Sequence, residues 1–104
     1  MSKQQLNIDY LSLPTNELLE KFGEGSHVPG SGSAAAFSGL LGVELMKTVC
    51  KLTLTRQEEK YLKVHREIKI IFERVEETKN ELITLFQEDA NCFHQVSSLR
   101  VERD

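Results

Sequence analysis

A chain of 104 residues can form one domain at most. Hydrophobic residues make up 39% of it and charged residues 28%, a balance typical of a soluble protein with a modest core. The net charge of −3 gives no reason to expect nucleic acid or an anionic membrane as a partner.

Targeting, membrane and disulfide signals are weak in this sequence. The amino terminus lacks the apolar run of a signal peptide, and the longest nearly apolar stretch, 34–43, is far shorter than the about 20 residues of a membrane span. Cys50 and Cys92 lack the dense, even spacing of a secreted disulfide scaffold. We therefore expect a cytoplasmic protein with two reduced, packed thiols and no membrane partner.

The first predicted helix is short and covers residues 14–22. Ser12 or Thr15 is placed to cap its start, and Gly23 is placed to stop it. One face of this helix is apolar, through Leu18, Leu19 and Phe22. We expect that face to cover part of the longer helices that follow.

A Gly/Ser/Pro loop then leads into a helix of very small residues. Gly30 and Gly32 tolerate positive φ, and Ser31 or Ser33 is placed to cap the helix. Backbone amides, serine hydroxyls and the positive end of the helix dipole meet at this turn, which suits a carboxylate or a phosphate. Gly30, Ser31, Gly32 and Ser33 are therefore candidate ligand-binding residues. The alternative interpretation is a flexible turn that binds nothing, since a lone glycine motif is weak evidence.

The second helix is predicted over residues 33–54 and the third from Arg56. Thr55 and Glu58 have the spacing of a capping box, which marks the start of the third helix. From residue 44 to residue 104 the sequence contains no Gly and no Pro. A largely apolar seven-residue repeat runs through positions 61, 68, 75, 82, 89 and 96, with companions at 64, 71, 78, 85, 92 and 99. This repeat predicts one continuous helix to about residue 98 with a buried seam.

The unequal lengths of these two helices favour self-assembly. At 1.5 Å per residue the second helix is about 33 Å long and the third about 64 Å, so a hairpin of the two leaves half of the longer seam uncovered. The uncovered stripe would aggregate in a lone monomer; it consists of Leu82, Leu85, Phe86, Phe93 and Val96. We expect an all-α helical bundle with a short first helix, a small-residue second helix and a long third helix, completed by oligomerisation through this seam or by further helices.

Asp89 is the candidate catalytic residue because it occupies a seam position among apolar neighbours. An ionised carboxylate in such surroundings is costly, so it needs a hydrogen-bond donor or a proton. Acids at apolar positions often serve as general acids or bases. The alternative is a break in the register, with Asp89 at the rim of the contact. The sequence offers no metal-ligand spacing, and we expect neither a metal nor a prosthetic group.

Four pieces of the sequence, taken together, resemble the cyclodeaminase/cyclohydrolase family of folate enzymes. They are Pro29-Gly-Ser-Gly-Ser-Ala-Ala-Ala36, Leu52-Thr-Leu54, Tyr61 and Glu88-Asp-Ala-Asn-Cys-Phe93. The family includes the cyclodeaminase part of formiminotransferase-cyclodeaminase and bacterial methenyltetrahydrofolate cyclohydrolases. The resemblance lies in the order and spacing of these pieces over residues 11–96.

The resemblance implies an all-α homodimer or higher assembly that acts on a tetrahydrofolate derivative, as a lyase of the cyclodeaminase type or as a hydrolase. Asp89 would be its acid/base, and Gly30, Ser31, Gly32 and Ser33 its glycine loop. Residues 1–104 would form a single helical domain that corresponds to the N-terminal half of the family's domain. The alternative function is a non-catalytic helical assembly module derived from that family.

Overall fold

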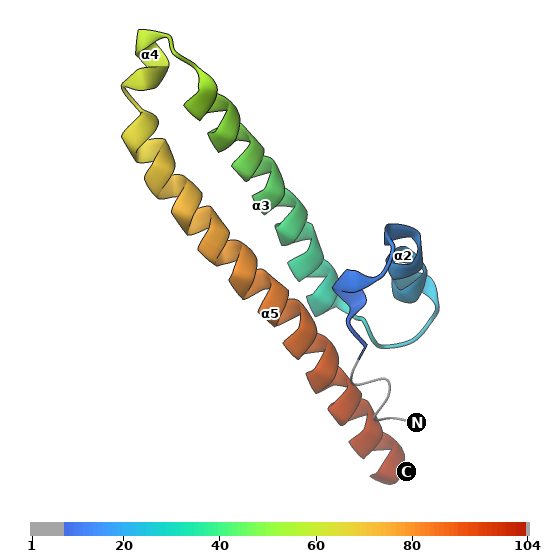
Figure 1. Ribbon diagram of the computed structural model, residues 1–104. Helices are drawn as coiled ribbons and strands as arrows, with labels where there is room; N and C mark the ends of the chain where they lie inside the picture. The colour runs from blue at the N-terminus through green and yellow to red at the C-terminus, as the bar shows by residue number, and fades with distance from the viewer. Residues whose placement is uncertain (1–7, 104) are drawn as a thin grey trace.

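The computed structural model describes the backbone of residues 8–103 and the side chains of residues 8–92. Its elements are a short 3-10 helix η1 (Tyr10–Ser12) and the helices α2 (Thr15–Gly23), α3 (Ser31–Thr55), α4 (Glu59–Leu62) and α5 (His65–Arg103) (Figure 1). The described part of the chain contains no strand. The expected all-α class is therefore confirmed, with a short, a small-residue and a long helix in that order.

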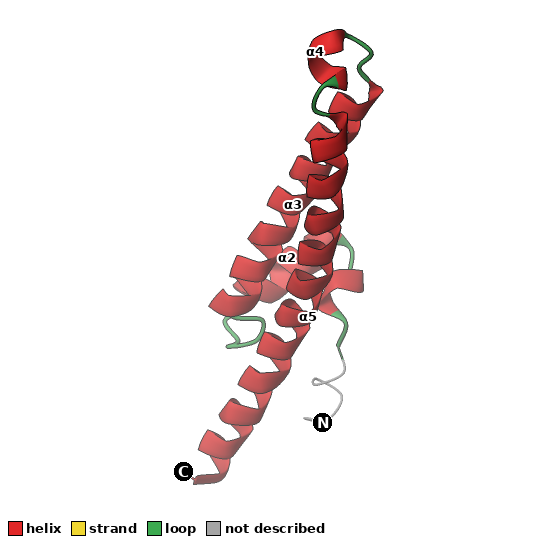
Figure 2. Ribbon diagram, turned by 90° about the vertical axis from the view of Figure 1, so that its left-hand side faces the viewer, coloured by secondary structure: helices red, strands yellow, loops and turns green. Residues whose placement is uncertain are grey.

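Helices α3 and α5 form an antiparallel hairpin, and α4 lies at its tip (Figures 1 and 2). The molecule is elongated, with extents of 66 × 23 × 18 Å. Helix α2 and η1 lie beside the end of the hairpin that is opposite to α4 (Figure 1). We call this end, where the first two elements pack on the hairpin, the base, and the two-helix part between it and α4 the arm.

The core lies in the base. Its buried residues come from η1, α2, the loop, α3 and α5, and they are Tyr10, Leu18, Val28, Ala36, Phe86 and Ala90. Phe86 is fully buried, and its ring lies 6.3 Å from the ring of Tyr10 and 6.2 Å from that of Phe22. Such tilted and edge-to-face pairs add to the hydrophobic contribution of the buried rings. The short first helix therefore covers the hairpin, as its apolar face predicts.

The predicted caps are wrong at both helix starts. Pro14 is the N-cap of α2 and Gly30 is the N-cap of α3, and neither supplies a side-chain cap. Helix α3 begins at Ser31, two residues before the predicted start, so Ser33 lies inside its first turn. The hydroxyl of Ser33 donates instead to the carbonyl of Phe86, at 3.1 Å. A polar group that faces a second helix is thus used for a tertiary contact.

The capping box at the tip is also wrong. Thr55 is the last residue of α3, and its hydroxyl donates backward to the carbonyl of Leu52, at 2.7 Å. The third helix is not continuous from Arg56, because the single-turn helix α4 and a turn at residues 63–64 precede α5. From His65 onward the long continuous helix is confirmed over 39 residues, about 58 Å.

The buried seam of α5 runs in a different direction from the predicted one. Val75 and Phe86 are buried, whereas the predicted companions Ile71 and Leu85 are 43% and 54% exposed. Phe72 and Phe86, four residues after the seam positions 68 and 82, are more buried than Ile71 and Leu85, which lie three residues after them. At the base, η1 and α2 pack on this side of α5, where the ring of Phe86 contacts those of Tyr10 and Phe22. Phe86 is therefore not part of an open stripe, and Phe93 and Val96 lie outside the described side chains.

The two cysteines have different surroundings. Both are free thiols; Cys50 is buried between α3 and α5, whereas Cys92 is exposed. The prediction of two packed thiols is therefore wrong for Cys92. Helix α3 is also long and apolar enough, by length and composition, to cross a membrane, and 22% of its most apolar window is buried. Core helices of soluble proteins pass the same test, so this property assigns no membrane role.

Candidate functional site

Asp89 lies against the first turn of α3. An ideal Cβ built on Gly32 would lie 2.6 Å from Cγ of Asp89 and 2.7 Å from Oδ2, which is closer than real Cβ atoms approach other groups. The carboxylate therefore rests on the backbone of Gly32, in space that only glycine leaves free. Two parts of the sequence that were singled out separately, the glycine loop and the acid of the long helix, meet within one chain.

Ser33 supplies the hydrogen bond that the half-buried acid needs. Its side chain has no exposed surface, and its hydroxyl lies 3.1 Å from the carbonyl oxygen of Phe86 and 3.3 Å from Oδ2 of Asp89. A hydroxyl has one proton to donate, so these two acceptors share it. Of the two alternatives expected for Asp89, a proton on the acid or a hydrogen-bond donor beside it, the structure shows the donor.

The backbone of α3 adds a favourable field at the same place. The first amide of the helix that bonds within it is that of Ala34, which donates to the carbonyl of Gly30 at 3.0 Å. The amides before it belong to the first turn, where intrahelical acceptors run out and the helix dipole is positive. A negative charge on Asp89 or on a bound ligand is favoured at this end of the helix.

Two hollows lie on either side of this turn. One, of about 370 Å³, is mostly apolar and has the acid at its edge; it is lined by Gly32, Ala35, Ala36, Leu82, Leu85 and Asp89. The other, of about 510 Å³, lies under the loop and is lined by Phe22, Ser26, His27, Pro29, Gly30, Ser31 and Ala34. The four candidate loop residues are thus divided: Gly30 and Ser31 line the loop hollow, whereas Gly32 and Ser33 contact the acid.

The loop is built by space restrictions more than by unusual backbone angles. Gly25 is the described glycine with positive φ, at 87°, whereas Gly30 has a φ of −106°. A Cβ on Gly30 would lie 2.9 Å from the carbonyl oxygen of His27. The Ser26 hydroxyl donates to the carbonyl of Val28 at 2.9 Å and accepts from its amide at 3.1 Å. Positive φ is therefore not the reason for glycine at positions 30 and 32; close approach is.

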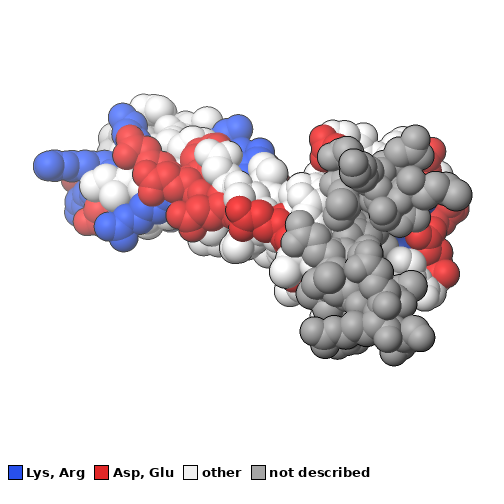
Figure 3. All heavy atoms as spheres, turned by 90° about the horizontal axis from the view of Figure 1, so that it is seen from below, with Lys and Arg blue, Asp and Glu red and all other residues white. Residues whose placement is uncertain are grey.

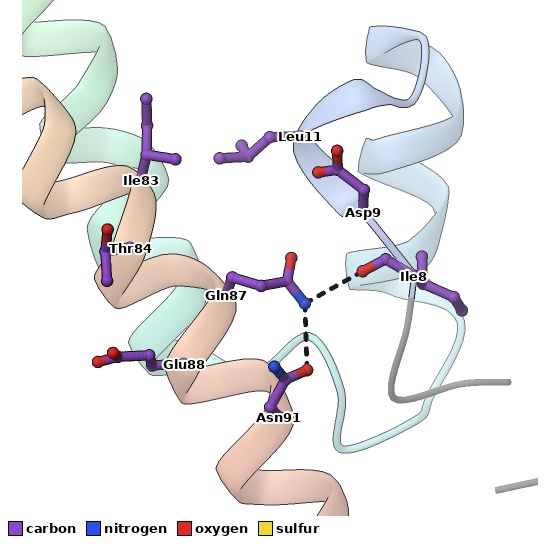
Figure 4. A pocket seen from close by; sticks show the side chains of 8 residues that line it. All are labelled: Ile8, Asp9, Leu11, Ile83, Thr84, Gln87, Glu88 and Asn91. Carbon is purple, nitrogen blue, oxygen red and sulfur yellow. Dashed lines mark hydrogen bonds between the residues drawn. The ribbon is translucent and has the colours of Figure 1, made fainter. Parts of the chain in front are cut away.

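A third hollow, of about 570 Å³, was not anticipated from the sequence (Figure 4). It lies between the residues before α2 and the side of α5 that bears Ile83 and Gln87. Glu88 and Asn91 also line it, with Asn91 below Gln87 and the Glu88 side chain directed toward the other side of α5. The Gln87 amide donates to the carbonyl of Ile8 and to Oδ1 of Asn91, both at 3.1 Å. These polar residues have no periodic pattern that would have revealed the hollow. Their visible role is to tie the start of the described chain to α5.

Tyr61, another residue of the family resemblance, lies apart from Asp89. Tyr61 lies at the tip of the hairpin, where it lines a hollow of about 200 Å³ with Val49, Leu52, Thr53 and Arg56. Gly32, which contacts the acid, and Val49, which lines this hollow, are 17 residues apart on α3, so about 26 Å of helix separates the hollow from the acid within one chain. Among the described residues, no group of three or more His, Cys, Asp or Glu side chains could hold a metal ion.

Comparison with known proteins identifies the family. The family profile described as formiminotransferase-cyclodeaminase matches residues 14–103. The chain belongs to the formiminotransferase-cyclodeaminase family. A curated member, the methenyltetrahydrofolate cyclohydrolase of Methylorubrum extorquens, is 34% identical over 85 residues, which are 78% of this chain and 40% of the relative. No solved structure matches the chain.

Family membership covers both parts of the site. The matched range includes the glycine loop, Ser33 and Asp89, so the resemblance drawn from the sequence is confirmed. The chain spans 40% of the length of the curated relative, and the rest of that protein has no counterpart in these residues.

Proposed function

We propose that this chain takes part in the folate one-carbon chemistry of its family, with Asp89 as the acid/base. The substrate is a tetrahydrofolate derivative that carries a one-carbon unit between two nitrogens, either 5,10-methenyltetrahydrofolate or its formimino precursor. The observation that carries the proposal is the Asp89 carboxylate, which is hydrogen-bonded to a buried hydroxyl and lies at the edge of a mostly apolar hollow.

A single carboxylate suffices for the proton transfers of the hydrolase reaction. Water adds to the bridging carbon of the methenyl cation, a C–O bond forms, and Asp89 accepts the proton that this water loses. The bond from that carbon to one nitrogen then breaks, Asp89 returns its proton to the departing nitrogen, and the hydroxyl of the adduct loses its proton to solvent. One water is consumed and one proton is released. The negative charge of Asp89 also offsets the delocalised cation before water adds.

The loop supports the binding of the anionic part of such a substrate. Gly30 and Ser31 line a hollow at the positive end of α3, with Ser26 and His27 beside them. Folates carry glutamyl carboxylates, and backbone amides at a helix start are suited to carboxylates. In this arrangement the tail binds under the loop and the reacting ring lies toward Asp89.

The absorbance of the methenyl group provides the test. We expect the purified chain to convert 5,10-methenyltetrahydrofolate, and we expect Asp89→Asn to lower kcat about 100-fold or more, since general acid/base groups contribute at least that much. Glu88→Gln is the matched control, because Glu88 is an exposed neighbour that lines the hollow on another side of α5. If the wild-type chain neither turns over the two folates nor gains thermal stability from them, a non-catalytic assembly module becomes the better description.

We also propose that the chain pairs with a second copy through the outer face of α3. Large apolar side chains are left exposed there and on the adjoining side of α5: Leu41, Leu45, Met46, Val49, Leu52, Ile71 and Leu85. All five residues of this set that belong to α3 are more than half exposed. An apolar face of this extent marks an interaction site. It lies chiefly on α3, whereas the sequence pointed to the seam of α5.

The distribution of charge favours an antiparallel pair. Residues 56–69, around the tip, hold five Lys or Arg against three Glu, whereas residues 73–89 hold six Asp or Glu against two Lys or Arg. Figure 3 shows the basic side chains gathered at one end of the arm and a band of acidic ones beside them. A two-fold pair with opposed arms brings the basic tip of each copy toward the acidic stretch of the other.

The mass in solution, measured by light scattering, tests this pairing. We expect a dimer for the wild type and a monomer for Leu45→Glu, with further dissociation of the wild type as salt rises. Leu19→Glu is the matched control, because Leu19 is 57% exposed but lies on α2. A monomeric wild type, or equal dissociation of the two variants, would show that this face is not the interface.

A further inference from the structure

We propose that Gly32 and Ser33 are positioning residues for Asp89 and that Ser33 is a hydrogen-bond partner for both protonation states of the acid. The inference rests on the function proposed above, which needs Asp89 to accept and return a proton. It assigns different tasks to the four loop residues: the outer pair, Gly30 and Ser31, faces the substrate, and the inner pair holds the acid.

The carboxylate of Asp89 packs directly on the backbone of Gly32. A Cβ at this position would lie within 2.7 Å of Cγ and Oδ2 of Asp89. The atoms it would meet are the end of a flexible side chain, so the carboxylate would rotate away while both helices stayed in place. Glycine is otherwise less favourable than alanine in a helix. The position of the acid, and not the fold, therefore explains glycine at position 32.

Ser33 is placed to exchange its hydrogen bonds as Asp89 changes charge. With the acid ionised, the hydroxyl proton is shared between Oδ2, at 3.3 Å, and the carbonyl of Phe86, at 3.1 Å. Once Asp89 has taken a proton, the hydroxyl donates wholly to the carbonyl, and its oxygen accepts from the carboxylic acid. Ser33 gains and loses no proton in this exchange. In this way the buried hydroxyl of Ser33 keeps an acceptor for its proton in both states of the acid.

Gly32→Ala separates the positioning role from a structural one. We expect this variant to be at least as stable as the wild type and to lose about 10-fold or more in kcat with little change in KM, because the acid is displaced. Gly42→Ala is the matched control, since Gly42 lies in the same helix and a Cβ there would meet nothing within 4 Å. Equal kcat values for Gly32→Ala and the wild type would show that the activity of Asp89 does not depend on glycine at position 32.

Ser33→Ala and Ser33→Thr test the hydrogen-bond exchange. We expect Ser33→Ala to lower kcat about 10-fold and Ser33→Thr to restore most of it. The added methyl group of threonine in a filled site should make Ser33→Thr the less stable of the two. Ser38→Ala, at an exposed position of α3, is the control and should behave as the wild type does. If activity follows stability across these variants, the role of Ser33 is merely structural.

The carboxyl-carbon chemical shift of Asp89, identified by its loss in Asp89→Asn, gives a readout that does not depend on turnover. Gly32→Ala and Ser33→Ala should move this resonance, whereas Gly42→Ala and Ser38→Ala should leave it in place. If the resonance shifts in these variants but the chain shows no turnover, the positioning of Asp89 by Gly32 and Ser33 is supported and the proposed function is contradicted. If the resonance does not move but the chain shows turnover, the proposed function stands and only the positioning role of Gly32 and Ser33 is contradicted.

Discussion

The base and the arm of the hairpin use the same two helices but are held together differently. In the base, η1 and α2 add a third side, and Phe86 and Ala90 lose all exposure to solvent. In the arm, α3 and α5 have only each other, and the buried apolar residues are few: Val43, Cys50 and Val75. Two helices can enclose one row of side chains, whereas three elements can enclose a cluster.

Ion pairs mark the arm where packing is thin. Lys47 lies 2.9 Å from Glu76 and 3.5 Å from Glu44, and Lys79 lies 2.7 Å from the other oxygen of Glu44. We call this chain of four residues the ionic row. It links α3 to α5 along one edge of the arm. The comparison teaches that the acid of the site was placed where its neighbours are fixed from several sides.

The largest expected loss of stability comes from the centre of the base. Phe86→Ala should lower the free energy of unfolding by about 3–5 kcal/mol, because it removes a fully buried ring and its contacts with Tyr10 and Phe22. Urea unfolding followed by circular dichroism measures this change. A loss below about 1 kcal/mol would mean that the aromatic cluster does not hold the base together.

The corresponding change in the arm should cost less. Val75→Ala removes a buried side chain from the single row between α3 and α5, and we expect a loss of about 2 kcal/mol. The same urea titration provides the value. If Val75→Ala destabilises the protein as much as Phe86→Ala does, the arm is packed as tightly as the base.

High pH should weaken the base selectively. Burial, with the nearby charge of Glu24 as a second cause, raises the pKa of Tyr10 above its ordinary value of 10.0. Because the folded state favours the neutral phenol, its contribution is complete below pH 10 and is lost as the pH rises toward the raised value. Thermal unfolding between pH 8 and 11 should therefore show a steeper decline for the wild type than for Tyr10→Phe. Parallel declines would exclude Tyr10 as the cause.

The smallest effect is expected in the ionic row, at low pH. Hydrogen bonding to Lys79, with the charges of Lys47 and Lys79, lowers the pKa of Glu44 below its ordinary value of 4.5. Its contribution is present above that value and is lost as the pH falls through the lowered one. Wild type and Glu44→Gln should thus differ in melting temperature near neutral pH, less so in high salt, and converge in acid. A difference that persists in acid would point to packing and not to charge.

The fold followed from the sequence where the pattern was long. The seven-residue repeat and the absence of Gly and Pro predicted most of α5, and the run of small and apolar residues predicted α3 to within two residues at each end. The predictions of helix caps failed. Ser33 and Thr55 were expected to cap helix starts, but their hydroxyls donate to the carbonyls of Phe86 and Leu52. Which side of α5 is buried also escaped prediction, since it depends on where η1 and α2 pack, and that is a property of the whole chain.

The residues of the site could be predicted from the sequence, but their arrangement in space could not. The costly position of Asp89 and the small residues of the loop both stood out in the sequence. That Gly32 and Ser33 touch this acid inside one chain could not be derived, because residues 56 or 57 positions apart meet only once the length of the turn at the tip sets the register of the hairpin. The hollow around Gln87 left no pattern in the sequence at all.

The ionic row has a bearing on how far the chain can associate. Charges line one edge of the arm, and the exposed apolar face described above lies on α3 and the adjoining side of α5. A molecule that pairs through one such face forms a closed dimer, because the face of each copy is then covered by the other copy and cannot bind a third. The four charged side chains of the ionic row would in this way keep that edge of a strongly apolar helix from adding further copies into a fibre.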